Sequence, residues 1–260
     1  MSAPVLVTIT DAIATVTINR PERLNAMDSH AHLALSDALD AVAADPEVRV
    51  VVLTGSGDRA FSAGRDLKEL ADDDADHAAI DARWLKIRRL TDRFDYPLPV
   101  IARVGGLALG GGFELALACD IIVASSTASF ALPEGKRGLI PFAGGVHRLP
   151  RQLPLKTAMG LMLTGRSIDA AHAFALGLVN EVVDPDALDA AVGSWAADIV
   201  ACAPLSIASI RQCAMAGLGL PLERAMAVAY PAELRRQRSR DAIEGPRAFA
   251  EKRPPVWANG

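Results

Sequence analysis

The first fifty residues show two kinds of hydrophobic periodicity. Apolar and polar side chains alternate over residues 5–10 and 14–19, with Asp11 in the break between them. Because neighbouring side chains of a strand point to opposite faces, this pattern predicts an antiparallel hairpin with one buried face. Asp28 then stands before an Ala- and Leu-rich segment that runs to about Ala44. A carboxylate in that place predicts the N-cap of a helix.

Further strands and helices follow in recurring units. Residues 48–54 are almost continuously apolar, which is typical of a strand buried on both faces. Shorter strands are predicted over residues 100–104, 120–124 and 128–130. Helices are predicted from about Asp76 to Phe94 and from near Gly111. The strand–strand–helix units have no fixed sequence period, so they do not indicate a simple solenoid.

After residue 185 the pattern becomes helical to the end of the chain. No long linker separates the two parts. We therefore predict an α/β core that carries the active site over residues 1–200. A helical region over residues 201–260 would extend it.

Bulk composition excludes several classes of protein. The 260 residues are 51% hydrophobic, with a formal charge of −4 and a pI near 5.7. Such a chain is globular, and it has no general attraction for nucleic acid or anionic membranes. The N-terminus has no signal-peptide pattern, and charged residues interrupt the most apolar stretch. These features predict a cytoplasmic protein with no membrane association.

Cysteines and histidines fit no metal site. The cysteines are odd in number and form no CxxC pair, so we expect reduced thiols. His30 and His32 are two residues apart on a predicted helix and do not share a face. No HExxH motif or Cys/His cluster occurs, so no zinc site is predicted.

Two glycine-rich loops each follow a buried strand and open a helix. The first is Phe61–Asp66, with Ala63 and Gly64 at its turn, and the second is Gly105–Gly112. Neither carries a dinucleotide or phosphate-loop fingerprint. Backbone N–H groups at such turns are partly unpaired, and small side chains let a ligand approach them. One N–H from each loop can hold a carbonyl oxygen as an oxyanion hole. The alternative is a pair of tight turns without a ligand.

Two glutamates accompany these loops. Glu114 falls in the first turn of the helix after the second loop, among apolar neighbours. It is either a solvent-exposed residue at a helix start or a buried functional group. Glu134 lies between Pro133 and Gly135, where an exposed turn residue paired with Lys136 or Arg137 is the alternative. If the intervening helix and strand bring the carboxylates face to face, the pair can perform acid–base chemistry.

These segments together resemble the crotonase superfamily, and within it the enoyl-CoA hydratases, along nearly the whole chain. The matching marks include residues 19–26 (NRPERLNA), 61–66 (FSAGRD), 108–116 (ALGGGFELA), 130–134 (FALPE), 177–180 (GLVN) and 248–253 (AFAEKR). The resemblance implies an α/β fold, a crotonase spiral of ββα units with a C-terminal helical trimerisation region. It also implies homotrimers, often stacked as hexamers.

The resemblance further implies roles for particular residues. The oxyanion hole maps onto the N–H groups of Ala63 and Gly111, and the catalytic carboxylates map onto Glu114 and Glu134. Glu114 would activate water that attacks Cβ, and Glu134 would deliver a proton to Cα. The implied activity is reversible hydration of a 2-enoyl-CoA. The acyl-CoA is the expected partner, and no separate cofactor is expected, because coenzyme A belongs to the substrate.

Substrate contacts are implied in the same way. The residues expected to bind acyl-CoA are Arg23, Leu24, Ala26, Ala63, Gly64, Arg65, Asp66, Gly110, Phe249 and Lys252. Phe249 and Lys252 would reach the nucleotide end of CoA in a neighbouring subunit.

Arg65 departs from the pattern, because hydratases often carry a small residue beside the acyl pocket. The segments around Glu114 and Glu134 also resemble carnitinyl-CoA dehydratases. Such an enzyme, or another crotonase-type dehydratase or isomerase for a specialised acyl-CoA, is therefore the alternative. Arg65 is a poor neighbour for a trimethylammonium group. An RNA-binding relative is a further alternative, supported only by the arginine run at residues 235–240.

Overall fold

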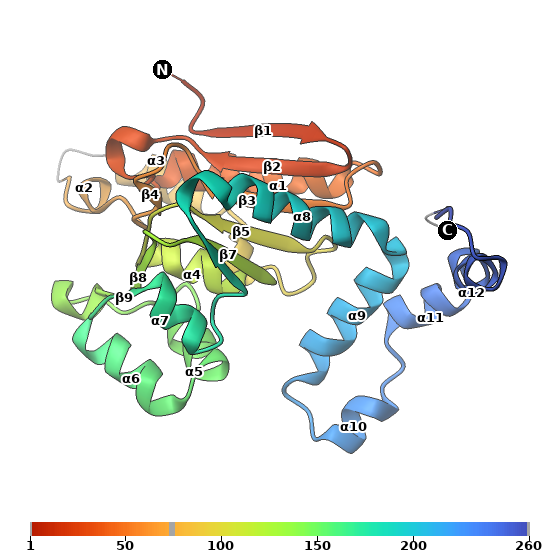
Figure 1. Cartoon of the computed structure of the whole chain (residues 1–260). Coiled ribbons are helices and arrows are strands. Elements are labelled where there is room, and N and C mark those ends of the chain that lie inside the picture. The colour runs from red at the N-terminus through yellow and green to blue at the C-terminus, as the bar shows by residue number, and fades with distance from the viewer. Residues whose placement is uncertain (1, 73–75, 259–260) are drawn as a thin grey trace.

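The computed structural model describes residues 2–72 and 76–258 (Figure 1). Two sheets form the core. The larger has the strand order β1-β2-β3-β5-β7-β10, in which β1 and β2 are antiparallel and the other pairs are parallel. Its strands are β1 (Val5–Thr10), β2 (Ile13–Ile18), β3 (Val50–Gly55), β5 (Val100–Val104), β7 (Ile121–Ser125) and β10 (Glu181–Val183).

The smaller sheet has the order β4-β6-β8-β9, with β8 and β9 antiparallel. Its strands are β4 (Ala60–Ser62), β6 (Leu107–Leu109), β8 (Ser129–Ala131) and β9 (Ile168–Asp169). In each of the consecutive pairs β3–β4, β5–β6 and β7–β8, the first strand belongs to the larger sheet and the second to the smaller sheet. This alternation is a spiral of ββα units, and it confirms the predicted fold class.

Twelve α-helices are assigned within the described residues. They are α1 (Ser29–Ala44), α2 (Leu67–Leu70), α3 (His77–Trp84), α4 (Gly111–Ala118), α5 (Gly145–Gln152), α6 (Leu155–Thr164), α7 (Ala170–Ala175), α8 (Leu188–Ala201), α9 (Pro204–Gly217), α10 (Leu222–Ala227), α11 (Pro231–Gln237) and α12 (Asp241–Glu251). Short 3-10 helices are η1 (Pro21–Arg23), η2 (Leu90–Asp92), η3 (Glu134–Arg137) and η4 (Pro185–Ala187).

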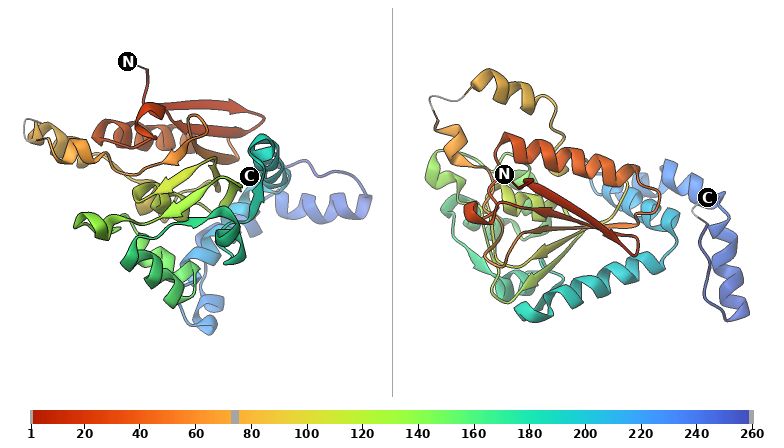
Figure 2. Two further views of the ribbon diagram at one scale, coloured as in Figure 1. Left: turned by 60° about the vertical axis from the view of Figure 1, so that its left-hand side comes forward. Right: turned by 90° about the horizontal axis from the view of Figure 1, so that it is seen from above.

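Helices cover both faces of the larger sheet (Figure 2). On one face, Leu35 and Leu39 of α1 join the cluster that contains Val16 and Leu53. On the other, α8 packs over Val50 and its neighbours. This burial on both sides explains why β3 is apolar at nearly every position. The Asp28 carboxylate accepts a hydrogen bond from the Ala31 N–H at 2.8 Å, so the predicted cap of α1 is confirmed.

The predicted helix from residue 76 to 94 is wrong in its length. Helix α3 ends at Trp84, and only the short η2 follows. The reason is tertiary: Arg93 turns inward and is held by Ser36 and Asp40 of α1. A continuous helix would not leave this segment free to wrap around α1, so packing overrides the local pattern.

The C-terminal helices α9–α12 extend away from the sheets (Figures 1 and 2). The end of α8 coincides with the predicted boundary near residue 200. In the described part of the chain, no single helix is long and apolar enough to cross a membrane. The segments Pro185–Ala201 and Pro204–Gly217 pass that length and composition criterion only together, with a 103° bend between them.

Candidate active site

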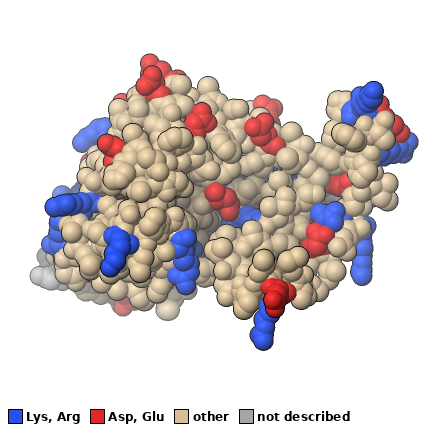
Figure 3. Space-filling model, turned by 60° about the horizontal axis from the view of Figure 1, so that its bottom comes forward, with Lys and Arg blue, Asp and Glu red and all other residues tan. Residues whose placement is uncertain are grey.

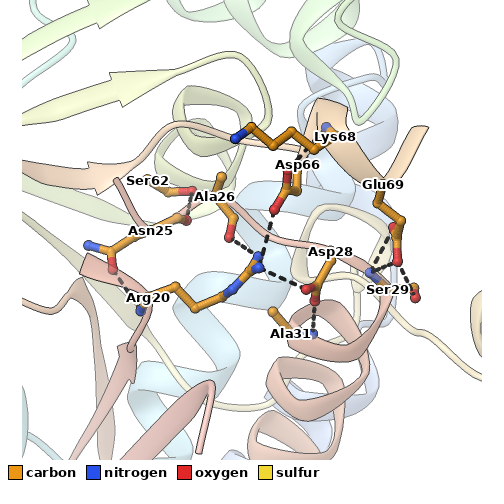
Figure 4. Close-up of polar contacts among 10 residues, drawn as sticks. All are labelled: Arg20, Asn25, Ala26, Asp28, Ser29, Ala31, Ser62, Asp66, Lys68 and Glu69. Carbon is orange, nitrogen blue, oxygen red and sulfur yellow. Dashed lines mark hydrogen bonds and ion pairs between the residues drawn. The ribbon is translucent and has the colours of Figure 1, made fainter. Parts of the chain in front are cut away.

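The first glycine loop is fixed by a polar network at the end of β4. Ser62 Oγ donates to the Asn25 carbonyl at 2.8 Å and accepts from the Gly64 N–H at 3.1 Å. Figure 4 shows Arg20 reaching both Asp28, at 2.8 Å, and Asp66, at 3.2 Å. Asp66 also caps α2 by accepting a hydrogen bond from the Lys68 N–H. The strand, the loop and the start of α1 are therefore tied together.

The two glycine loops pack directly against each other. A Cβ on Gly112 would lie 2.0 Å from the Ser62 carbonyl oxygen, which no side chain can tolerate. Gly64 has a φ of +84°, and a Cβ there would lie 2.6 Å from the Gly111 nitrogen. Both positions therefore require glycine, and the requirement comes from the close approach of the two backbones.

The structure corrects one of the two predicted oxyanion donors. The Ala63 N–H donates to the Leu24 carbonyl at 2.9 Å, so it is not free to bind a ligand. The next N–H in the loop that is free to bind a ligand belongs to Arg65. The backbone hydrogen bonds to Met27 are made by its two neighbours: the Gly64 carbonyl accepts from the Met27 N–H, and the Asp66 N–H donates to the Met27 carbonyl. Within the described residues, no acceptor is bonded to the N–H of Arg65 or of Gly111. These two groups lie close together, since a Cβ on Gly111 would be 3.6 Å from the Arg65 nitrogen.

Glu114 is buried beside this N–H pair. Its side chain is on α4, it is 3% exposed, and its Oε1 accepts a hydrogen bond from the Gly145 N–H at 2.7 Å. Burial raises the pKa of Glu114 to about 7, against the stabilising effect of the Gly145 N–H. The interpretation of Glu114 as a solvent-exposed residue is therefore wrong: the carboxyl group is buried, as its functional interpretation requires.

Glu134 starts η3 and is partly buried. Its Oε1 would lie 3.0 Å from a Cβ on Gly110, so its carboxylate borders the second glycine loop. Its Oε2 is buried and has no hydrogen-bond partner in the described structure. Burial raises the pKa of Glu134. The alternative of a turn residue paired with Lys136 or Arg137 is not observed, since Lys136 binds the Gly165 carbonyl and Arg137 the Pro133 carbonyl.

The two carboxylates act on each other. The charge of Glu134 raises the pKa of Glu114 further. The pKa of Glu134 is also raised, chiefly by burial, so both carboxyl groups hold a proton to a higher pH than an exposed glutamate. One protonated and one ionised carboxyl group beside two N–H donors form a combined acid, base and anion-binding site.

The residues predicted to contact CoA divide into two groups. Leu24, Ala26 and the Ala63–Asp66 loop lie together, because Leu24 binds Ala63 and the Ala26 carbonyl binds Arg20 beside Asp66. Arg23 is exposed at the end of η1. Phe249 is 87% exposed on α12, and Lys252 follows that helix, away from the loops (Figure 1). Their role in a neighbouring subunit stays a prediction.

A ring cluster on the far side of Arg65 was missed from the sequence. The Arg65 guanidinium lies over the Trp84 indole, 5.1 Å from the ring centroid, and Trp84 contacts His32 with ring centroids 4.9 Å apart. Burial, followed by the charges of Arg89 and Arg65, lowers the pKa of His32 to about 4. The sequence pattern indicated no catalytic or metal-binding role for His30 and His32. In the described part of the chain, no group of three or more His, Cys, Asp or Glu residues could hold a metal ion.

Comparisons with known proteins agree on one family. The family model described as enoyl-CoA hydratase/isomerase matches residues 8–260. A carnitinyl-CoA dehydratase of Citrobacter koseri is 44% identical over 252 residues, which are 94% of each chain. The solved structure of an enoyl-CoA hydratase from Mycobacterium marinum is 40% identical, with a TM-score of 0.90 over 100% of both chains. One from Mycobacterium tuberculosis is 37% identical, with a TM-score of 0.89 over the same share.

Proposed function

Because the chain belongs to the enoyl-CoA hydratase/isomerase family of the crotonase superfamily, we propose that it is an enoyl-CoA hydratase. The reaction is the reversible syn addition of water to a 2-enoyl-CoA thioester, which gives a 3-hydroxyacyl-CoA. One observation carries the proposal: two glutamates with raised pKa values accompany the loop whose Gly111 N–H is unpaired in the described structure. Glu134 borders this loop at Gly110, and Glu114 lies in the first turn of the helix that the loop opens. An isomerase needs a single carboxylate, so two favour hydration and dehydration.

In the proposed mechanism, the thioester oxygen accepts hydrogen bonds from the N–H groups of Arg65 and Gly111. Ionised Glu114 takes a proton from water as the water oxygen attacks Cβ. The electron pair of the double bond moves to the thioester oxygen as an enolate, which the two N–H groups stabilise. Protonated Glu134 then delivers its proton to Cα, and the thioester carbonyl re-forms. One proton has moved onto Glu114 and one has left Glu134, and exchange with solvent restores the pair.

Hydration and dehydration start from opposite distributions of one proton between the two carboxyl groups. Hydration starts with Glu134 protonated and Glu114 ionised. Dehydration starts with Glu114 protonated, so that it can protonate the departing hydroxyl group while Glu134 takes the Cα proton. With a pKa of about 7, Glu114 is present in both states near neutral pH and can serve either direction.

Coenzyme A is part of the substrate in this proposal, and no other cofactor is required. The CoA moiety would follow Arg23, Leu24 and Ala26 beside the first loop. We also propose self-association as a homotrimer or a hexamer. Helices α9–α12 expose the large apolar side chains Ile210, Leu218, Leu222, Met226 and Ile243. Figure 3 shows broad uncharged surface between scattered charges. We propose that a second copy of the chain packs against this surface.

Dehydration of carnitinyl-CoA is the second candidate. It is favoured by the 44% identical relative, which is named a carnitinyl-CoA dehydratase. The same two carboxylates would serve, so the candidates differ only in the acyl group.

The test of the chemistry is the Glu134→Gln variant. We expect its kcat for crotonyl-CoA hydration to fall by about 10²- to 10⁴-fold, the usual contribution of a general acid. Binding of acetyl-CoA should stay near the wild-type affinity, because the amide keeps the shape of the side chain. The matched control is Glu223→Gln, on the exposed surface of α10. Near-normal turnover by Glu134→Gln would rule out this mechanism.

A further inference from the structure

The side chain of Arg65 is a cation without a counter-ion. Every other arginine that reaches toward a neighbouring element at this end of α1 and α3 has a polar partner: Arg83 binds Ser29, Arg89 binds Asp92 and Arg93 binds Asp40. Arg65 has only the face of Trp84, and no carboxylate or carbonyl oxygen binds its guanidinium within the described residues. The Trp84 Nε1 is also a buried donor without an acceptor there. Arg65 is exposed, so a ligand can reach its guanidinium, and among the described residues neither this cation nor the Trp84 N–H has an acceptor.

The backbone of Arg65 lies at the proposed oxyanion site, because its nitrogen would be 3.6 Å from a Cβ on Gly111. The next residue, Asp66, binds Arg20, which also binds the Ala26 carbonyl in the segment assigned to CoA. The Arg65 side chain is directed instead to Trp84 of α3, which contacts His32 of α1. We therefore assign the Arg65 guanidinium to the acyl end of the substrate.

The distance along the side chain matters as well. The Arg65 N–H would bind the thioester oxygen, whereas its guanidinium is several bonds further out. A group that meets the guanidinium therefore belongs to the far end of a short acyl chain.

We propose that Arg65, held on Trp84, selects a 2-enoyl-CoA whose acyl chain ends in a carboxylate. This rests on the proposed hydratase function and names its substrate class. An arginine offers paired N–H donors that fit a carboxylate. A cationic acyl group is disfavoured twice. It meets a like charge, and the aromatic face that could bind a trimethylammonium is already covered by the guanidinium.

The experiment compares three substrates of matched size: 4-carboxybut-2-enoyl-CoA, neutral 5-methylhex-2-enoyl-CoA and cationic 4-trimethylammoniobut-2-enoyl-CoA. Values of kcat/KM are measured for the wild type and Arg65→Met. The wild type should prefer the anionic substrate, and Arg65→Met should lower the anionic-to-neutral ratio by about 10- to 100-fold, as expected for a charged hydrogen bond. The cationic-to-neutral ratio should rise, since the Trp84 face becomes free. Ratios within one variant cancel any common change at the oxyanion site.

Two further variants sharpen the result. Arg65→Lys keeps the charge but loses the flat stack, so it should retain part of the preference. Arg88→Met removes one positive charge from the same segment, where the side chain is 61% exposed, and should leave the ratio within about twofold of wild type.

Three outcomes overturn the inference. One is a wild-type ratio of one or less, and another is a ratio unchanged in Arg65→Met. The third is an equal loss for all three substrates, which would place the guanidinium on a CoA phosphate. If no enoyl-CoA is hydrated, the proposed function fails. The inference is then decided by calorimetric affinities for saturated 4-carboxybutanoyl-CoA and 5-methylhexanoyl-CoA, in which Arg65→Met must remove a preference for the anion.

Discussion

Glu114 connects the chemistry of the site to the stability of the fold. The carboxyl group is almost fully buried and accepts a hydrogen bond from the Gly145 N–H. Its pKa rises from an ordinary 4.5 to about 7, chiefly because burial disfavours the charge. A group whose pKa is raised in the folded state contributes stability below its unfolded pKa. That contribution is lost as the pH rises through the folded pKa.

The magnitude follows from the two pKa values. Each unit of difference is worth about 1.4 kcal/mol, so ionising Glu114 in place costs about 3 kcal/mol once the pH is well above 7. Glu114→Gln keeps the shape and the acceptor for the Gly145 N–H but never ionises. Its free energy of unfolding, relative to wild type, should therefore rise by about 3 kcal/mol between pH 4.5 and pH 8. Hydration activity should be lost in the same variant.

The assay is urea unfolding of both proteins at one-unit pH steps, at a fixed protein concentration because self-association adds to stability. Glu223→Gln serves as the control, since its exposed carboxylate loses little hydration on folding, and its curve should run parallel to wild type. Equal pH dependence for wild type and Glu114→Gln would show that Glu114 is ionised at no cost. The shared-proton mechanism would then lack its basis.

Two more predictions concern the backbone and the core. Gly64→Ala should lower kcat for crotonyl-CoA by about 10²-fold or more in steady-state assays, because a Cβ 2.6 Å from the Gly111 nitrogen must displace an oxyanion donor; an active Gly64→Ala would argue against this donor pair. Arg93→Met should lower the free energy of unfolding by about 2–4 kcal/mol in urea titrations, since it removes the hydrogen bonds of a buried guanidinium to Ser36, Asp40 and the Arg88 carbonyl. The exposed Arg88→Met should cost less than about 1 kcal/mol, and equal losses in the two variants would contradict that reading.

Much of the fold could be predicted because its signals are local. The alternation in β1 and β2, the apolar run of β3 and the cap at Asp28 each depend on a few neighbouring residues. The extent of α3 could not be predicted in this way. Whether the chain stays helical beyond Trp84 depends on Arg93 finding Ser36 and Asp40, more than fifty positions earlier.

The site shows the same division. Glycine and glutamate in the two loops indicated acid–base and anion-binding chemistry, and the structure places both carboxylates beside the loops. Which N–H of the first loop is free to donate could not be predicted from the loop sequence alone. Whether Ala63 or Arg65 keeps a free N–H depends on which of them pairs with the Leu24–Met27 segment, and Ala63 is the one that does.

Because of that pairing, the backbone N–H and the side chain of Arg65 are positioned by different contacts. The N–H of Arg65 is positioned by backbone contacts of Gly64 and Asp66 with Met27, and these do not involve the Arg65 side chain. The side chain is placed independently, by the face of Trp84. Gly64 and Gly112 have no room for a side chain, so the anion-binding backbone tolerates no change there. Position 65 can vary in size and charge while its N–H stays in place. If the side chain of residue 65 selects the acyl group, as we propose, a substitution there would change the acyl preference while Glu114, Glu134 and the N–H donors stay in place.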